Sequence, residues 1–512
     1  MWFDIFEKTS TLDLALMERP EITTLYEEAR AATNNNRCTN VLDAFFNNIT
    51  IIITIASLVY ILVAVQFAVV IVIAVVVILQ AFSTIESKRR QYAVWKEDAK
   101  TNKEISYCMG LLFDKRCANE MRLHNMSSWL IGKYKAVRER SDALWTSTRK
   151  GKAIFNAINE LLVIVQQGVL YLFLAHQMIF RGLSFANFTL FFSSINLLSS
   201  NSSNFLSSII SINDDARYIK SFKAYMQLDN VIAVHKENET PLVADMFLTG
   251  ELNFKDVAFS YPGSGKILFD QLSIDIKMQE FYVIVGPNGA GKTTFINLLM
   301  RLYDPTGGNI SLNGTDIRDF NFQKYRDNFG VVFQDYMVFE YSIYENITMD
   351  SQETPEAIEK VTDVVNRSGL VGKVSSLDKG IFTRLGKKFD TEGVNLSGGE
   401  YQKVALAKAL YRNSPMLVLD EPSSALDAFA EEELIKLFKE SSNSKTVFYI
   451  SHRLSVAKYA YKVIFINDGK IHGFDSHSNL LRDNLMYKEM FEAQAQHYTS
   501  GDSYERSQNK AR

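Results

Sequence analysis

The fold is decided by the stretch Gly286-Pro287-Asn288-Gly289-Ala290-Gly291-Lys292-Thr293. It follows the β-forming run 281–285 and opens a helical pattern from Thr293 to Leu302. Glycines let backbone N–H groups converge on an anion, and the helix N-terminus adds the positive end of its dipole. In such a loop the lysine reaches the β- and γ-phosphates of a nucleotide and the threonine hydroxyl faces Mg²⁺. We therefore expect this loop, with the following Thr294, to bind a nucleotide.

A second motif lies downstream, where the apolar run Met416–Leu419 ends in Asp420. A carboxylate at the end of a buried strand is the usual partner of the phosphate loop, because it holds the metal. Glu421 comes next, and a second carboxylate just past the strand end is well situated to polarise the water that attacks the γ-phosphate. The alternative is that Glu421 is a surface acid at a strand terminus.

Between these motifs stands Leu396-Ser397-Gly398-Gly399-Glu400, followed by Gln402. In this order the segment resembles the signature motif of ABC transporter ATPases. The resemblance assigns Tyr261 to stacking on adenine, Gln334 to the metal and attacking water, and His452 to the switch histidine. Each also has a simpler reading, as a turn aromatic, a strand-end amide or a strand-end histidine. The resemblance further implies a dimer-contact loop at Ser424-Ala425-Leu426-Asp427.

The same resemblance implies a mechanism that needs two chains. Two ATP-binding domains would pair head to tail, with each ATP and its Mg²⁺ between one phosphate loop and the opposite signature motif. Ser397, Gly398 and Gly399 would then contact the partner's nucleotide. The chain carries one copy of each motif, so a second ABC half-transporter subunit is required. A homodimer is favoured over a heterodimer because the catalytic positions are all intact.

The first half of the chain contains long uncharged stretches, at 44–85, 161–180 and 182–213. A membrane-crossing helix needs about 20 apolar residues. The first stretch therefore predicts a helical hairpin with its tip near Gln66, and the other two predict a second pair of spans. A buried core element is the alternative for the first stretch. A Ser-rich loop is the alternative for the last span, whose Ser and Asn residues favour a helix facing protein or water.

Basic residues flank these stretches at Lys88–Arg90 and at Arg149–Lys152. Lys and Arg resist translocation, so both flanks are expected in the cytoplasm. The charged, helical segment 86–152 then becomes a cytoplasmic excursion, in which Cys117–Leu123 resembles a coupling helix. This predicts a multi-pass protein of the cell membrane with a cytoplasmic ATPase domain. The lipid bilayer is thus an expected partner.

Spans fused to one ATP-binding domain resemble an exporter-type half-transporter, for which six spans are the family expectation. Four are visible here, and the opening charged residues resemble the cytoplasmic stretch after a second span. A fragment, a misplaced gene start and a naturally shortened form are the open alternatives. The resemblance implies ATP-driven export of a peptide, lipid or amphipathic drug. The alternative function is a membrane-tethered ATPase that regulates or assembles with a partner without transporting.

The composition of the 512 residues excludes some other classes. A net charge of −3 without a clustered basic face gives no nucleic-acid footprint. The odd number of cysteines argues against a closed disulfide framework. The expected fold is multi-domain, with an α-helical transmembrane bundle followed by an α/β phosphate-loop ATPase domain. The expected domains are a cytoplasmic helical segment (1–45), a transmembrane region with its excursion (46–213), a connecting helix and linker (214–248), the ATP-binding domain (249–495) and a disordered tail (496–512).

Overall fold

The computed structural model describes residues 1–34, 37–63, 67–230, 232, 242, 245–423 and 428–494. The chain divides into two compact units. A helical unit comprises Met1–Lys8 and Thr24–Leu228, and an ATPase unit comprises Thr9–Thr23 and the chain from Asp229 on. Some predictions lie outside the described residues, namely the tip at Gln66, the loop 424–427, most of the linker and the tail after 496.

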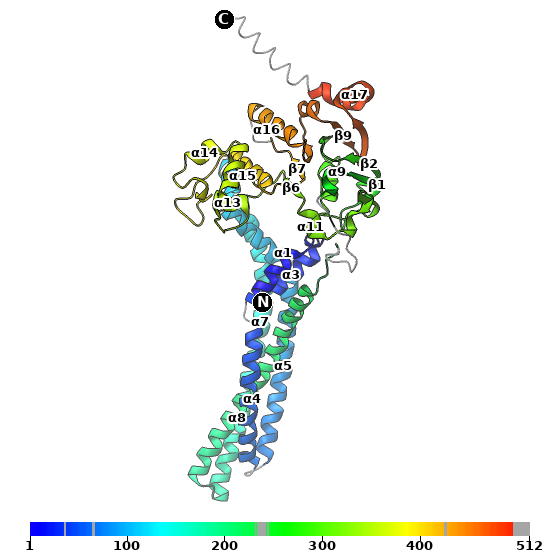
Figure 1. Ribbon diagram of the computed structural model, residues 1–512. Coiled ribbons are helices and arrows are strands. Elements are labelled where there is room, and N and C mark those ends of the chain that lie inside the picture. Colours follow the sequence, from blue (N-terminus) through cyan, green and yellow to red (C-terminus); the bar gives the residue numbers. More distant parts are fainter. Residues whose placement is uncertain are drawn as a thin grey trace. The chain divides into compact units, whose positions relative to one another are not determined.

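The described residues up to 230 form helices (Figure 1). Their bounds are α1 Trp2–Thr11, α2 Leu14–Met17, α3 Pro20–Asn34, α4 Arg37–Val63, α5 Phe67–Phe113, α6 Lys115–Leu123, α7 Ser127–Arg181 and α8 Phe185–Met226. The expected excursion is therefore the continuation of α5 and α7 beyond their apolar parts, joined through the short α6. The segment expected to act as a coupling helix coincides with α6.

Three helices among the described residues are long and apolar enough to cross a membrane. They are α4, α5 from Phe67 to Trp95, and α7, with mean hydropathies of 2.1, 2.8 and 1.6. The fourth expected span, α8, lies outside this set because of its Ser and Asn residues. It is nevertheless one continuous helix, so the Ser-rich loop is excluded. The turn before it begins at Gly182, whose φ of 68° ends α7.

The four long helices share one apolar cluster. Its buried members are Leu58, Leu62, Val69, Ile73, Leu170, Leu174, Phe191, Ile195 and Leu198. The polar residues of α8 point partly into the same interior, where Ser199 accepts a hydrogen bond from Gln166 at 3.2 Å and Asn196 accepts one from Gln167 at 3.1 Å. This pairing explains why a span with so many polar side chains packs as a helix, since buried polar groups need partners.

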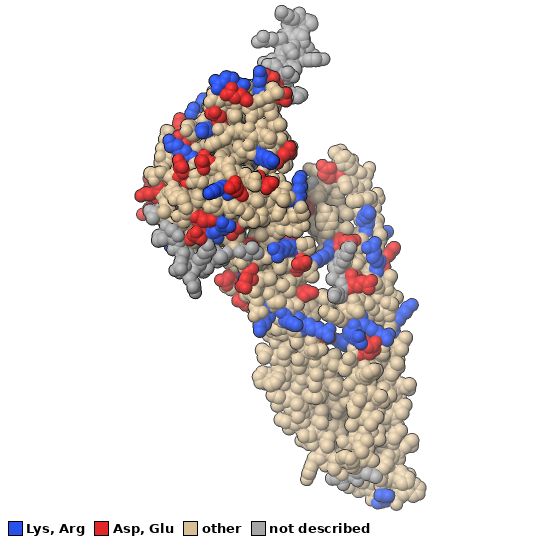
Figure 2. Space-filling view, turned by 90° about the vertical axis from the view of Figure 1, so that its right-hand side faces the viewer, with Lys and Arg blue, Asp and Glu red and all other residues tan. Residues whose placement is uncertain are grey.

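Charged side chains are unevenly distributed on the helical unit. Figure 2 shows a band of Lys and Arg across it, beside a long surface with almost no charge. Many large apolar side chains are exposed on these helices, among them Ile53, Phe82, Ile164 and Leu172. A water-soluble surface rarely exposes so much contiguous apolar area, whereas a lipid-facing one requires it. The exposed apolar surface therefore fits insertion in a bilayer.

The ATPase unit contains two sheets. The larger has the order β10-β9-β3-β8-β7-β6, in which all neighbours are parallel except β10 against β9. Its strands are β3 Phe281–Val285, β6 Phe329–Val332, β7 Met416–Asp420, β8 Thr446–Ile450, β9 Lys462–Asn467 and β10 Lys470–Asp475. The smaller, antiparallel sheet has the order β2-β1-β4-β5. Its strands are β1 Glu251–Phe259, β2 Phe269–Lys277, β4 Gly307–Leu312 and β5 Thr315–Asp316.

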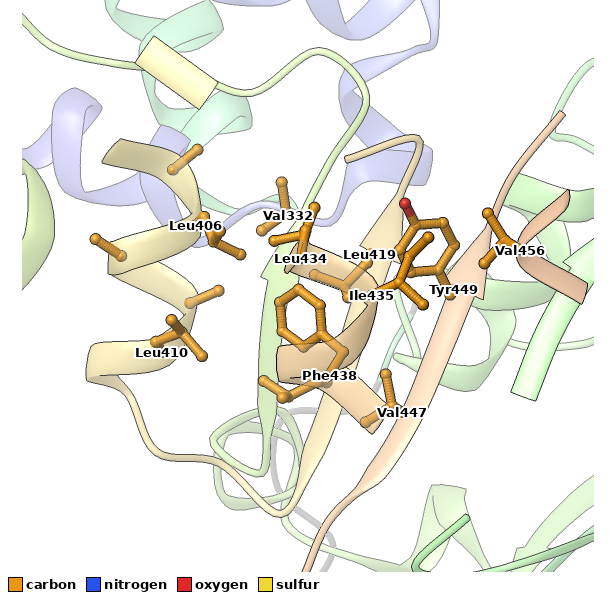
Figure 3. Packing of buried hydrophobic residues seen from close by; sticks show 14 of the residues in the cluster. Val332, Leu406, Leu410, Leu419, Leu434, Ile435, Phe438, Val447, Tyr449 and Val456 are labelled. Atoms are coloured by element: carbon orange, nitrogen blue, oxygen red, sulfur yellow. The ribbon is translucent and has the colours of Figure 1, made fainter. Parts of the chain in front are cut away.

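Helices and the smaller sheet cover the larger sheet on its two faces, so its central strands are almost wholly buried. Parallel strands buried on both faces are continuously apolar rather than alternating. On β7, Leu417 and Leu419 belong to one core, and Met416 and Val418 belong to the other. Figure 3 shows the first core, where Leu406 and Leu410 of α15 (Gly398–Tyr411) and Phe438 of α16 (Ala428–Ser441) meet the sheet.

The remaining helices of this unit are short. Their bounds are α9 Met246–Thr249, α10 Lys292–Leu299, α11 Phe322–Arg326, α12 Ile343–Thr348, α13 Pro355–Arg367, α14 Val371–Ser375 and α17 His477–Asp483. The segment 9–23 also belongs here, since Ala15 lies in the second core and Glu18 accepts a hydrogen bond from Tyr303 at 2.8 Å. The expected segment 1–45 is thus divided between the two units.

Candidate functional site

The glycine loop runs from the end of β3 to the start of α10, as the sequence predicts. Two of its glycines are required by sterics. A β-carbon on Gly286 would lie 1.9 Å from the carbonyl oxygen of Ile466, and one on Gly291 would lie 2.8 Å from the ring of Phe269. The backbone of Gly286 (φ 155°) and of Gly291 (φ 107°) also lies in a region that favours glycine.

Lys292 lies inside the curl of this loop. Its Nζ donates to the carbonyl oxygens of Gly286 and Pro287, at 2.9 Å each. Burial lowers the pKa of its ammonium, while the neighbouring Glu421 and Asp420 oppose that shift. A cation that is held only by carbonyl groups can exchange them for the oxygens of a stronger acceptor, such as a phosphate.

The parallel sheet brings four chain segments to one edge. Its strands β3, β8, β7 and β6 are adjacent and parallel, so their carboxyl ends meet where ligands bind in open α/β sheets. The loop follows β3, His452 follows β8, Asp420 ends β7 and Gln334 follows β6. An open cavity of about 780 Å³ lies there, lined by Tyr261, Leu268, Asn288, Gly289, Gly291, Lys292, Thr293, Thr294, Gln334, Glu421 and His452.

Asp420 is buried beside the loop, with 4% of its surface exposed. Its Oδ2 accepts a hydrogen bond from the Thr293 hydroxyl at 3.1 Å. The pKa of the Asp420 carboxyl is raised to about 6, chiefly by burial and in part by the nearby Glu421, while the hydrogen bond from Thr293 opposes the shift. A buried, ionised carboxylate of this kind is unfavourable unless a cation lies close by.

Glu421 and His452 form a second pair over the cavity. The Nε2 of His452 lies 2.5 Å from Oε1 of Glu421. Burial lowers the pKa of His452, with Lys292 adding to the effect and Glu421 opposing it. Glu421 has a φ of 49°, and its N–H donates to the carbonyl of Ile450 at 3.1 Å. A non-glycine residue held in the left-handed region is strained, and such strain clusters at functional sites.

Tyr261 also lines the cavity. Its hydroxyl is 2.8 Å from that of Thr294, and its ring packs edge-on against Phe259 and Tyr303. These contacts hold the ring at the cavity wall, so its assignment to adenine stacking remains open as a prediction. Leu268 lines the cavity too and is absent from the sequence-based set. It precedes β2, and only the pairing of β2 with β1 brings it here.

The signature segment begins α15. Ser397 and Glu400 form a reciprocal capping box, in which the Ser397 N–H donates to Oε2 of Glu400 at 2.7 Å. This hydrogen bond from the Ser397 backbone is the largest of the effects that lower the pKa of the Glu400 carboxyl. Ser397 and Gly398 are exposed, and within the described chain none of the residues 397–399 lines the cavity. The helix N-terminus therefore faces outward with its dipole available to another molecule.

Two hydrogen bonds link this helix to Glu421 and to the segment after Gln334, and sequence reasoning found neither. Gln402 on α15 donates to the carbonyl of Glu421 at 3.5 Å. Tyr336, two residues after Gln334, donates to the carbonyl of Gly398 at 3.1 Å. A movement of the signature helix would thus act on the carbonyl of Glu421 and on the segment that follows Gln334.

Comparison with known proteins indicates the same family as the motifs do, over more of the chain. Residues 269–424 match the family described as ABC transporter. The chain is similar to the subtilin transport ATP-binding protein SpaT of Bacillus subtilis, with 30% identity over 96% of this chain and 79% of the relative. It is also similar to the nisin transport ATP-binding protein NisT of Lactococcus lactis, with 24% identity over 95% of this chain and 80% of the relative.

A shorter similarity, 32% identity over 55% of this chain and 48% of the relative, connects it to the ATP-dependent lipid A-core flippase of Vibrio vulnificus. Among solved structures, a bacterial Atm1-family ABC exporter with ATP bound shares the fold. That likeness has a TM-score of 0.79 at 22% identity and covers 96% of this chain and 84% of the other. The motifs, the cavity and these similarities agree, and the chain belongs to the ABC transporter family.

Proposed function

We propose that this chain is one of two identical subunits of an exporter that moves a peptide out of the cytoplasm at the expense of ATP. The chain is an ABC exporter, an integral membrane protein with a cytoplasmic ATPase domain. The identity of the two subunits, the class of solute and the residue roles below are our proposals. The domain limits expected from the sequence are also proposals.

The observation that carries the proposal is the pair Glu421 and His452, 2.5 Å apart over the phosphate loop. In our proposal Glu421 accepts a proton from the attacking water, and His452 orients the Glu421 carboxylate and hydrogen-bonds the γ-phosphate. Lys292 leaves its carbonyl partners for the β- and γ-phosphates. Proton transfer to a positioned carboxylate contributes typically about 10²- to 10⁴-fold to a rate.

Mg²⁺ fits the donors beside the loop. The Thr293 hydroxyl and the Asp420 carboxylate are 3.1 Å apart, and the Gln334 amide lines the same cavity. Oxygen donors of this kind are what Mg²⁺ prefers, with the remaining positions filled by phosphate and water. When bound there, the ion would neutralise charge that develops on the phosphates. It would also relieve the electrostatic cost of burying Asp420.

Two copies are needed because the signature segment is directed away from the cavity of its own chain. We propose that Ser397, Gly398 and Gly399 cover the nucleotide of a second copy, using the Ser397 hydroxyl, backbone N–H groups and the dipole of α15. The hydrogen bonds of Gln402 and Tyr336 support a coupling between that contact and the cavity residues.

The choice of a peptide rests on how the relatives cover the chain. The two relatives matched over at least 95% of this chain, its helical unit included, are named for transport of subtilin and of nisin. The relatives named as lipid A-core flippases match between 48% and 67% of the chain. Solute choice belongs to the membrane helices, so the longer similarities are the more informative. A tethered ATPase that moves nothing is less consistent with relatives that are named for transport.

Substitution Glu421→Gln tests the catalytic proposal. In the purified full chain reconstituted in lipid, we expect ATP binding to remain within about threefold of the wild type and turnover to fall by about 10²-fold or more. Glu392→Gln is the matched control, because Glu392 is an exposed acid that pairs with Lys379 and is not among the residues lining the cavity. Retained hydrolysis in Glu421→Gln would contradict the assignment.

A further inference from the structure

One charged side chain stands alone among the apolar stretches of the helical unit. Stretches 44–85, 153–180 and 182–213 contain a single Asp, Glu, Lys or Arg, which is Glu160. A charge at this depth is costly in a membrane and by default marks a functional site. Among the described residues no Lys or Arg forms an ion pair with Glu160, so it has no internal counter-charge there.

Glu160 lines a small polar cavity between α5, α7 and α8. The cavity has a volume of about 210 Å³ and is lined by Gln80, Ala81, Thr84, Asn159, Glu160, Val163, Ser203, Leu206 and Ser207. Gln80 and Thr84 lie within the uncharged stretch 44–85, and Ser203 and Ser207 lie within 182–213. The cavity therefore belongs to the part of the helices that is built for the bilayer, near its cytoplasmic side.

Hydrogen bonds fix the polar wall of this cavity. Gln80 is 91% buried, and its Oε1 accepts from the Ser203 hydroxyl at 2.8 Å. The Nε2 of Gln80 donates to the Asn159 carbonyl at 3.4 Å, and the amide of Asn159 donates to the Thr84 hydroxyl at 3.5 Å. These bonds leave the amide oxygen of Asn159 buried without a donor. Side chains from three helices thus hold each other in place around an unfilled acceptor.

The open position of the cavity is the Glu160 carboxylate, an exposed acceptor, and beside it Asn159 Oδ1 is a buried acceptor without a donor. A site whose open position is an anionic acceptor, set among amides and hydroxyls, selects a ligand with several donors and a positive charge. A primary ammonium has that chemistry, with three donors on a compact cation. The uncharged stretches of a second copy contain no Lys or Arg, so a second copy offers no cation from these stretches to fill the site.

We propose that this cavity, which we call the Glu160 site, binds a primary ammonium group of the transported peptide, on a lysine side chain or the amino terminus. The inference rests on the proposed function and deepens it, because it names the part of the solute that the helices recognise. The amide and hydroxyl wall replaces the water of the ammonium, and the carboxylate supplies its counter-charge.

The test uses the full chain in vesicles of phosphatidylglycerol and phosphatidylcholine, which contain no primary ammonium. Two probes are compared, an amphipathic lysine-bearing peptide and the same peptide acetylated at its terminus with every lysine replaced by glutamine. We expect the lysine peptide to stimulate hydrolysis at a concentration about tenfold lower or more, as a charge-assisted hydrogen bond allows. In Glu160→Gln this preference should vanish while basal hydrolysis is unchanged, and Glu160→Asp should restore part of it.

Gln167→Leu is the matched control, because Gln167 also lies on α7 and loses a polar bond, to Asn196, outside the cavity. It should keep the preference. If both peptides stimulate hydrolysis by the wild type at the same concentration, or Glu160→Gln keeps the preference, the inference is overturned while peptide export stands. If neither peptide stimulates hydrolysis, the inference is overturned; if neither accumulates in the vesicles when ATP is supplied, the proposed function fails as well. Stimulation only after phosphatidylethanolamine is added would assign the ammonium to a lipid and overturn the proposal.

Discussion

Replacing Gly286 by alanine tests whether the glycine loop has the geometry described above. The new β-carbon would lie 1.9 Å from the carbonyl oxygen of Ile466, a fully buried residue of strand β9. Backbone there is flanked by β3 and β10 and cannot move aside. Overpacking costs about 1–3 kcal/mol and unfavourable backbone another 1–2 kcal/mol. If the loop distorts to relieve about 3 kcal/mol of this strain, nucleotide binding should weaken by about 100-fold.

The assay is equilibrium binding of a fluorescent ATP analogue to the purified chain, with a thermal unfolding scan to show that the fold survives. Gly314→Ala is the control. Gly314 also has a positive φ, of 80°, but a β-carbon there meets no atom within 4 Å. It should lose about 1 kcal/mol of stability and no affinity. Binding by Gly286→Ala within threefold of the wild type, at an unchanged melting temperature, would refute the reasoning.

Three further predictions concern other parts of the chain. Ser397→Ala should cost about 1 kcal/mol of helix-cap stability and also lower turnover, whereas Ser342→Ala, which removes a similar capping box, should cost stability alone in melting and hydrolysis assays. Burial lowers the pKa of Lys445 from 10.5 to about 8. Between pH 8 and 10.5 the unfolded chain therefore binds more protons than the folded chain, so the free energy of unfolding should increase with pH, and denaturation of Lys445→Gln should show a smaller increase. In the membrane helices, Ser199→Ala should destabilise by about 0.5–2 kcal/mol because it strands Gln166, and adding Gln166→Leu should recover most of that loss in a double-mutant cycle.

Most of the candidate nucleotide site could be predicted because its parts are local in sequence. The glycine loop and His452 each follow a short apolar strand, Asp420 ends another, and parallel strands place such positions at one edge. The similarities to ABC transporters confirm the family that these motifs indicated. Roles of individual residues, including Tyr261 and Gln334, stay predictions.

Other features depend on side chains that meet across long sequence separations. Leu268 reaches the cavity through the pairing of β1 with β2, and Gln402 reaches Glu421 because α15 packs beside the sheet. No local pattern marks the segment 9–23 as part of the ATPase unit, yet Glu18 accepts a hydrogen bond from Tyr303 there. The fourth span is also ambiguous from its sequence, because its Ser and Asn residues find partners on α7 only in the folded bundle.

Vesicle uptake tests the central claim most directly, namely that hydrolysis at this site drives a solute through the membrane helices. Inside-out vesicles containing the full chain would be given ATP together with the lysine-bearing peptide, a fluorescent phospholipid or an amphipathic dye. We predict ATP-dependent accumulation of the peptide that falls to background in Glu421→Gln. Full hydrolysis by the wild type without accumulation of any of the three solutes above the Glu421→Gln level would contradict the account.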